Sequence, residues 1–152
     1  MKHQCRNREF PWLQPELRGF PAVSRWGCGI RGAEQRRMDL PDLRPRTHRF
    51  AIDSIAFVRR LPNTSEAQVA GLQYLRSATG VNSNYRAARR GRSRKEFISK
   101  LGNVVEEADE SVEWLEVMRD SRIAHDSRLL GEAKELLAIF TASLKTARKN
   151  GQ

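Results

Sequence analysis

The chain has 152 residues, enough for one domain of ordinary size, and carries 28 Lys or Arg against 18 Asp or Glu, for a formal net charge of +10. This balance favours acidic partners such as nucleic acid, although a well-solvated basic surface is an equal alternative. No apolar run approaches the roughly 18 residues that span a bilayer, and no signal-peptide core is present, so the sequence predicts a cytoplasmic protein without a membrane segment.

Residues 1–37 have no sustained helical or strand period and contain three prolines and four glycines. This composition buries too little to offset the entropy of ordering, so we predict a disordered basic extension. Its aromatic residues, which suit stacking on bases, are Phe10, Trp12, Phe20 and Trp26. The alternative is that translation begins at Met38, where the composition changes abruptly, and that the extension is not part of the native protein.

Metal binding and catalysis are not predicted. Cys5, Cys28 and His3 are three candidate ligands without a second close pair, which is too few for a zinc site. His48 and His125 do not have the Glu-x-x-His spacing of a diiron bundle. No Ser or Cys lies in a recognisable nucleophile context. The sequence therefore predicts no cofactor and no enzymatic activity.

From residue 38 to residue 152 the hydrophobic pattern is helical, and this part is predicted to form one domain. A first helix is expected from about Pro45 to Leu61, ended by Pro62 and Asn63. Its buried side should contain Phe50, Ser54, Phe57, Val58 and Leu61.

A second helix is predicted from Ser65, which forms a capping box with Gln68, to about Arg90. It has two apolar stripes on nearly opposite sides, and a helix that is apolar on two faces is buried on two faces. The first stripe is Val69, Leu72, Leu75 and Thr79, and the second is Tyr74, Ala78, Val81, Tyr85 and Ala88. We expect one stripe to face the core and the other to meet a second subunit, with an oligomer interface made by Tyr74, Ala78, Val81 and Tyr85. The alternative is a helix in the middle of its own bundle.

A third helix of about 27 residues should begin at a capping box formed by Ser93 and Glu96, directly after Gly91. Its core side is predicted to contain Phe97, Leu101, Val104, Val105, Ala108, Val112 and Leu115. A fourth helix, capped by Asp126 or Ser127, should continue to about Arg148 and bury Leu129, Ala133, Leu136, Leu137, Phe140 and Leu144. Four helices with short joints predict an all-α, up-down-up-down four-helix bundle.

Six cations crowd into ten residues around the second joint, with no acid among those ten. This basic cluster consists of Arg86, Arg89, Arg90, Arg92, Arg94 and Lys95. Guanidinium groups suit bidentate contact with phosphate, so we predict binding to the nucleic-acid backbone without sequence readout. The alternative is structural, because cations at a helix C-terminus complement its dipole and can also pair with the acidic face of a neighbouring subunit.

Arg76 falls within an apolar stripe of the second helix, where a lone cation would be costly. Glu107, beside the apolar wedge of the third helix, is its natural partner. We predict a structural ion pair between Arg76 and Glu107 rather than a catalytic pair.

The run RSATGVNSNYRAARRGRSRKEFISKLGNVVEEADESVEWLEVM, followed by EAKELLAIFTASLKTAR, resembles a bacterial four-helix-bundle family. That family includes proteins encoded within intervening sequences of large-subunit ribosomal RNA genes and, more distantly, the retroelement accessory variability protein. The residues that carry the resemblance are Arg76-Ser77, Asn84-Tyr85-Arg86, Ser93-Arg94-Lys95-Glu96-Phe97, and Glu107 with Trp114-Leu115. The resemblance implies left-handed bundles that assemble into homopentamers, no enzymatic activity, and a recurring proposal of nucleic-acid binding.

Two functional hypotheses follow. The first is a non-enzymatic homo-oligomer that binds RNA or DNA backbone through a repeated Arg-rich surface. The second is a protein–protein interaction scaffold with no direct role in nucleic-acid binding. Steep salt dependence of nucleic-acid binding would distinguish the first hypothesis from the second.

Overall fold

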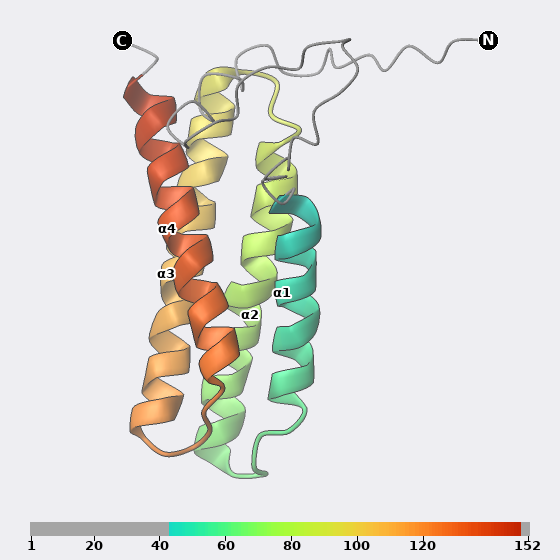
Figure 1. The fold of residues 1–152 in the computed structure, drawn as a ribbon. Coiled ribbons are helices and arrows are strands. Elements are labelled where there is room, and N and C mark those ends of the chain that lie inside the picture. Colours follow the sequence, from blue (N-terminus) through green and yellow to red (C-terminus); the bar gives the residue numbers. More distant parts are fainter. Residues whose placement is uncertain (1–42, 150–152) are drawn as a thin grey trace, which may run out of the picture.

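The computed structural model describes residues 43–149, which form four α-helices and no strand (Figure 1). The helices are α1 (Leu43–Val58), α2 (Ser65–Ala88), α3 (Arg94–Asp120) and α4 (Ser127–Lys149). The all-α prediction is confirmed. The predicted basic extension of residues 1–37 and the predicted boundary at Met38 lie outside the described residues. Within the described part, no helix is both long enough and apolar enough to cross a membrane.

Successive helices run in opposite directions, so the four helices form an up-down-up-down bundle (Figure 1). Each helix packs on the next one along the chain, and α4 closes the bundle by packing on α1. The most extensive packing is between α2 and α3, the two long helices joined by the shortest connection. Helix α1 is the shortest of the four and packs on α4 least.

Side-chain caps set the start of three helices. Thr64 caps α2 by accepting a hydrogen bond from the Ala67 N–H at 3.4 Å, so the cap lies one residue before the predicted Ser65. Ser93 caps α3 by accepting from the Glu96 N–H at 3.1 Å, and the predicted capping residue is confirmed. Asp126 caps α4 by accepting from the Leu129 N–H at 2.9 Å.

The predicted core faces of α1, α3 and α4 are confirmed with small differences in depth. Most of the predicted side chains are buried, whereas Val58, Leu61, Val105 and Leu137 are half-buried at the edge of the core. The first helix ends at Val58 rather than Leu61, because residues 59–61 form a turn before Pro62. The last helix extends to Lys149, close to the predicted end.

The assignment of the oligomer interface to one stripe of α2 is wrong. Tyr74, Ala78 and Val81 are completely buried inside the subunit, and Tyr85 is 8 % exposed. These four side chains form the core side of α2 because α1 and α3 pack on either side of them. The opposite stripe faces outward, with Val69 and Leu72 61 % and 66 % exposed. The sequence shows two apolar stripes but does not show which one meets the core.

Buried polar contacts between neighbouring helices fix the register of the bundle. Ser111 on α3 donates a hydrogen bond to Ser77 on α2 at 3.0 Å, and both residues are fully buried. Thr47 at the start of α1 lies 3.3 Å from the amide oxygen of Asn82. A shift of one helix turn would leave these buried groups without partners, which is costly in a dry interior.

Candidate nucleic-acid interface

A tight turn between α2 and α3 places the basic cluster at one end of the bundle. After α2 ends, the Gly91 N–H donates to the Ala88 carbonyl at 3.0 Å. A Cβ at Gly91 would lie 3.1 Å from that same oxygen and 3.2 Å from the Phe97 nitrogen, so the turn is packed too closely for a larger residue to enter without displacement. Because α3 starts three residues later, all six cations share this end.

Four members of the basic cluster are exposed, namely Arg86, Arg90, Arg92 and Lys95, and Arg89 is half-buried. Within residues 43–149, no carboxylate oxygen lies within 4.0 Å of a charged nitrogen of the basic cluster. The carboxylate of Glu96 accepts a hydrogen bond from the Arg92 backbone N–H at 2.8 Å instead. The positive charge at this turn is therefore not neutralised by an ion pair with the described residues.

Arg94 has a structural contact that sets it apart from the other cluster residues. Its guanidinium Nη2 donates a hydrogen bond to the carbonyl oxygen of Ala147, in the last turn of α4. Its Nε is buried and has no hydrogen-bond partner. A cation at this position complements the negative end of the α4 dipole. Arg94 thus links the start of α3 to the end of α4, a structural role within the subunit that the sequence interpretation did not specify.

The end of α4 adds cations that sequence reasoning did not include in the site. Helices α2 and α4 both finish at the end of the bundle where α3 begins. We define the basic end as residues 86–100 and 141–149, which contain ten Lys or Arg and one acid, Glu96. The cations are Arg86, Arg89, Arg90, Arg92, Arg94, Lys95, Lys100, Lys145, Arg148 and Lys149. Residues 43–85 and 101–140 have ten cations and twelve acids, so positive charge is concentrated at the basic end.

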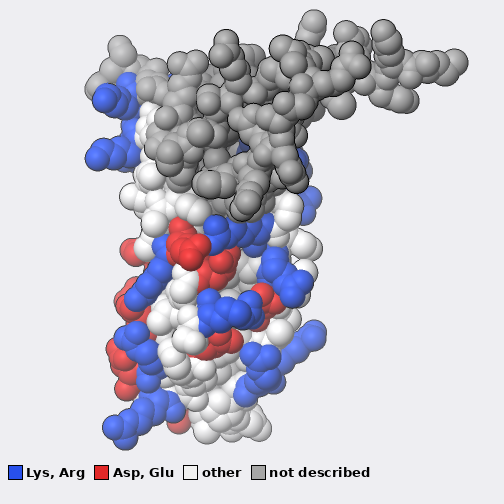
Figure 2. Space-filling model, in the orientation of Figure 1, with Lys and Arg blue, Asp and Glu red and all other residues white. Residues whose placement is uncertain are grey.

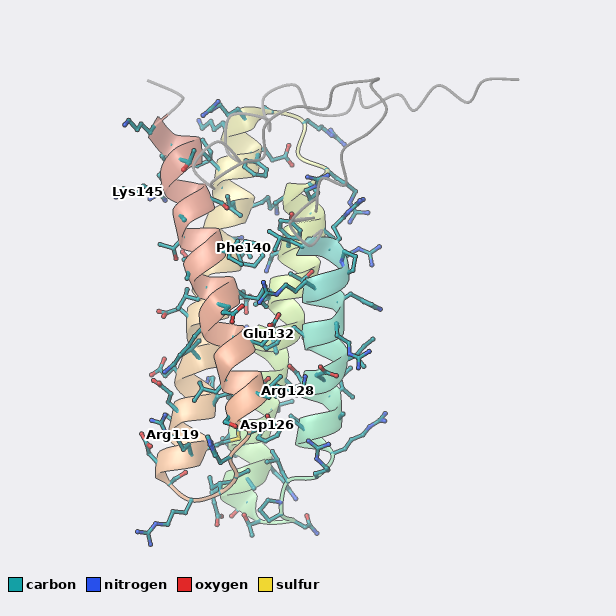
Figure 3. All side chains as sticks on the ribbon, in the orientation of Figure 1. Arg119, Asp126, Arg128, Glu132, Phe140 and Lys145 are labelled. Atoms are coloured by element: carbon teal, nitrogen blue, oxygen red, sulfur yellow. The ribbon has the colours of Figure 1, made fainter. Side chains whose placement is uncertain are left out.

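The surface view agrees with this division. Blue and red side chains intermingle along the body of the bundle, whereas the blue side chains at the upper left, near the end of α4, have no red neighbours (Figure 2). Lys145 lies toward that end of α4, away from Glu132 and Asp126 (Figure 3). The sequence signal that would have found the α4 cations is topological, since an antiparallel fourth helix must end beside the second joint.

The predicted ion pair between Arg76 and Glu107 is not formed. Arg76 is exposed on the outer side of α2, and no charged nitrogen of it lies within 4.0 Å of a carboxylate among the described residues. The prediction failed because the stripe that contains Arg76 is the outward one, where water solvates the guanidinium. Glu107 instead fits against Gly80, where a Cβ would lie 2.5 Å from its carboxyl carbon. Asn84 Nδ2 donates a long hydrogen bond to Glu107 at 3.5 Å.

The half-buried carboxyl of Glu107 has a pKa above its ordinary value. Burial is the largest cause, and the negative charges of Glu110 and Glu106 act in the same direction. The charge of Arg76 opposes these effects through space without reversing them. Glu107 therefore occupies a site that disfavours its ionised form.

Ion pairs elsewhere join α1 to α4. Arg46 Nε lies 2.6 Å from Glu132, and its Nη2 contacts Glu135 at 2.5 Å. Arg128 on α4 reaches Asp53 on α1 at 3.0 Å. These pairs strengthen the least extensive helix packing of the bundle, and they were not predicted because they depend on which helices close the bundle. Among the described residues, no group of three or more His, Cys, Asp or Glu side chains could hold a metal ion.

Four large apolar side chains are exposed on the outward sides of α1 and α2, where Arg76 is exposed as well. Ile52 and Ile55 on α1 are 46 % and 36 % exposed, and Val69 and Leu72 on α2 are exposed further. The hydrogen bond that pairs Ser54 with Tyr74 sets Ile55 at the level of α2 where Leu72 and Leu75 lie. We call Ile52, Ile55, Val69 and Leu72 the outer α1–α2 face.

Comparison with protein-family models and with curated proteins gave no match. Among solved structures, the chain is similar to a protein of unknown function from the S23 ribosomal protein family of Bacteroides thetaiotaomicron VPI-5482. The two chains are 25 % identical and superpose with a TM-score of 0.64 over 68 % of this chain and 99 % of that one. The similarity supports the all-helical fold and spans nearly the whole of that protein.

Proposed function

We propose that this protein is a non-enzymatic homo-oligomer of four-helix bundles that binds the nucleic-acid backbone through its basic end. The observation that carries the proposal is the uneven charge, with ten cations against one acid at one end of an otherwise balanced bundle. Phosphate contacts of this kind position a nucleic acid without reading its sequence. The uncompensated positive charge of Arg86, Arg90, Arg92 and Lys95 supports phosphate binding over a purely structural role.

Similarity to known proteins supports the same proposal. The similar Bacteroides protein is assigned to a family named for a ribosomal protein. The resemblance of residues 76–118 and 132–148 to proteins encoded in ribosomal RNA intervening sequences points to the same class of partner. A cytoplasmic location and a homopentameric ring are part of this proposal. In a ring the basic end would recur once per subunit, so that weak contacts would be multiplied by effective concentration.

The oligomer in this proposal forms through the outer α1–α2 face, which replaces the interface predicted from the sequence. Val69 and Leu72 lie about one helical turn apart on the side of α2 that faces away from the core, and they are 61 % and 66 % exposed. Burying them against a second copy would remove apolar surface from water. The same face supports a second candidate function, a scaffold that recruits another protein without any role for nucleic acid.

Salt dependence of RNA binding tests the proposal. The full chain should bind RNA in a filter assay, with affinity falling steeply between about 50 and 200 mM salt as counterion release loses its advantage. The triple variant Arg86→Gln, Arg90→Gln, Arg92→Gln should reduce the slope of log affinity against log salt by about 0.7–0.9 for each phosphate that the protein no longer neutralises.

The matched control is the double variant Arg59→Gln, Arg60→Gln, which removes exposed cations at the opposite end of the bundle. It should leave the slope unchanged. Light scattering with and without RNA reports stoichiometry in the same experiment. If no RNA or DNA binds even at the lowest salt, the scaffold function replaces the first proposal.

A further inference from the structure

The cations of the basic end occupy two separate corners of the bundle. Helix α2 contacts α1 and α3, and helix α4 contacts α3 and α1, but α2 and α4 do not pack on each other within the described part. They are therefore diagonal. Arg86 and Arg90 mark the corner at the end of α2, and Lys145 and Arg148 mark the corner at the end of α4. All four side chains are exposed.

The separation of these corners follows from ordinary helix packing. Neighbouring helix axes lie about 8–10 Å apart, so the diagonal of a square bundle is about 11–14 Å. This spacing between helix axes, from which the flexible Arg and Lys side chains extend, is of the same order as the roughly 12 Å width of the major groove of B-form DNA. The first turn of α3, which bears Lys95, lies between the two corners.

The basic end also lacks the surface that single strands require. Unpaired bases gain much of their binding energy by stacking on exposed aromatic side chains. The aromatic residues near this end are Tyr85, Phe97 and Phe140, which are 8 %, 4 % and 0 % exposed. Elsewhere among residues 43–149 only Trp114 is half-buried rather than buried, and it lies far along α3. The bundle therefore offers cations for phosphates but no platform for bases.

We propose that the basic end binds a nucleic-acid duplex, with one strand's phosphates at the α2 corner and the other strand's phosphates at the α4 corner. This inference rests on the proposed function and narrows its ligand from any nucleic acid to a double helix. It also gives the α4 cations a role, since a single phosphate row would need only one corner.

The test compares one strand alone with the same strand in a duplex. The probes are an unstructured pyrimidine DNA strand of about two helical turns, roughly 20 nucleotides, and that strand annealed to its complement to form B-form DNA. The protein is the full chain with Phe10, Trp12, Phe20 and Trp26 replaced by Ala, which removes base stacking on the Phe and Trp side chains outside the described part. Fluorescence anisotropy at low salt should show the duplex bound at least about tenfold more tightly than the single strand. Tenfold is about the affinity that a single strand loses when one base has no aromatic side chain to stack on.

Two double variants test the corners themselves. Arg86→Gln, Arg90→Gln at the α2 corner and Lys145→Gln, Arg148→Gln at the α4 corner should each reduce the salt slope for the duplex by up to about 1.8, which corresponds to two phosphates left without a cation. Arg59→Gln, Arg60→Gln is the control and should change nothing. Circular dichroism checks that each variant remains helical.

The outcomes separate this inference from the function on which it rests. Equal or tighter binding of the single strand would overturn the duplex assignment while leaving backbone binding in place. A salt slope that depends on the α2 corner alone would overturn the two-row arrangement. Failure of both probes to bind at low salt would overturn the proposed function itself.

Discussion

The phenol oxygen of Tyr74 on α2 lies 2.7 Å from the Oγ of Ser54 on α1, and both side chains are completely buried. Ser54 has one proton to donate, and it donates that proton to the Phe50 carbonyl at 2.7 Å. Tyr74 is therefore the donor and Ser54 the acceptor. Burial raises the pKa of Tyr74 well above its ordinary value, which keeps the phenol protonated for this role.

This direction of donation predicts unequal effects of two substitutions. Tyr74→Phe leaves only a serine lone pair unused and should lower the free energy of unfolding by about 0.5–1.5 kcal/mol. Ser54→Ala leaves a buried phenol proton without an acceptor and should cost more, about 1–3 kcal/mol. Chemical denaturation of the two variants and of the double variant measures both effects. A larger loss for Tyr74→Phe would reverse the assigned direction.

Arg94 is expected to stabilise the bundle more than it contributes to binding. Arg94→Met keeps the apolar stem but removes the hydrogen bond to the Ala147 carbonyl, and the free energy of unfolding should fall by about 1 kcal/mol. For a domain of this size the midpoint of thermal unfolding should fall by about 4 °C or more. The matched control is Lys95→Met, next in sequence and exposed.

Lys95→Met should leave the thermal midpoint unchanged while weakening RNA binding. An equal fall in thermal midpoint for both variants would mean that Arg94 is no more structural than its neighbour.

The contrast between helix faces shows what the sequence determines here. The period of Phe97, Leu101 and Val104 predicts both a helix and its buried side, because α3 has only one apolar stripe. On α2 both stripes are apolar, and the choice between Tyr74 and Leu72 as the core residue depends on where α1 and α3 pack. Because that choice depends on tertiary packing, the local periodicity predicted the helix correctly but did not identify which side of α2 faces the core.

The candidate site also has a part that the sequence predicts and a part that depends on the fold. Six neighbouring cations around Gly91 are visible in the sequence as a local cluster. The contribution of Lys145 and Arg148 appears only when the fourth helix is placed antiparallel to the third. Arg94 is less available for phosphate than its neighbours because it donates a hydrogen bond to the Ala147 carbonyl. This contact joins residues far apart in the chain, so the spacing of residues in the sequence does not predict it.

Arg76 is expected to contribute little to stability, contrary to the prediction from the sequence. Because its side chain is exposed and has no ion pair among the described residues, Arg76→Ala should change the free energy of unfolding by no more than about 0.5 kcal/mol. Thermal melting at neutral pH measures this directly. If Arg76→Ala lowered the free energy of unfolding by several kcal/mol, the ion pair between Arg76 and Glu107 predicted from the sequence would be supported instead.

Glu107 should make the stability of the bundle depend on pH. The pKa of the Glu107 carboxyl is higher in the folded state than in the unfolded state, where it is about 4.5. The protonated carboxyl therefore adds to the free energy of unfolding fully below about pH 4.5, and this stabilisation is lost as pH rises through the folded-state pKa. Glu107→Gln, which cannot ionise, should therefore raise the thermal midpoint at pH 7 relative to the native chain. Below pH 4 the difference should vanish or reverse.

Glu113→Gln is the control for this effect, because Glu113 is exposed on the same helix and no cation pairs with it among the described residues. The thermal midpoints of the Glu107→Gln variant and the native chain should converge on acidification, whereas the Glu113→Gln variant should not show this pattern. The difference in thermal midpoint between the Glu107→Gln variant and the native chain should be more positive at pH 7 than at pH 4. The opposite order would contradict the upward direction of the Glu107 pKa shift.

The outer α1–α2 face should control assembly without controlling folding. Val69→Lys with Leu72→Lys places two cations where the side chains are already 61 % and 66 % exposed, so the helix and the core should be retained. If a second copy covers this face, two buried charges would oppose association and the oligomer should dissociate. Light scattering should then report a smaller species at the same protein concentration, with unchanged helicity by circular dichroism.

The matched control for assembly is Ser99→Lys with Asn103→Lys, which adds the same charge at exposed positions of α3. This variant should keep the size of the native species, because the added cations lie away from the outer α1–α2 face.

Tyr74→Ala should instead affect folding, since it removes a fully buried aromatic side chain and should lower the free energy of unfolding by about 3–5 kcal/mol. A native chain that is already a single copy would show that this apolar face is not covered by self-association, and the scaffold function would then have to account for it.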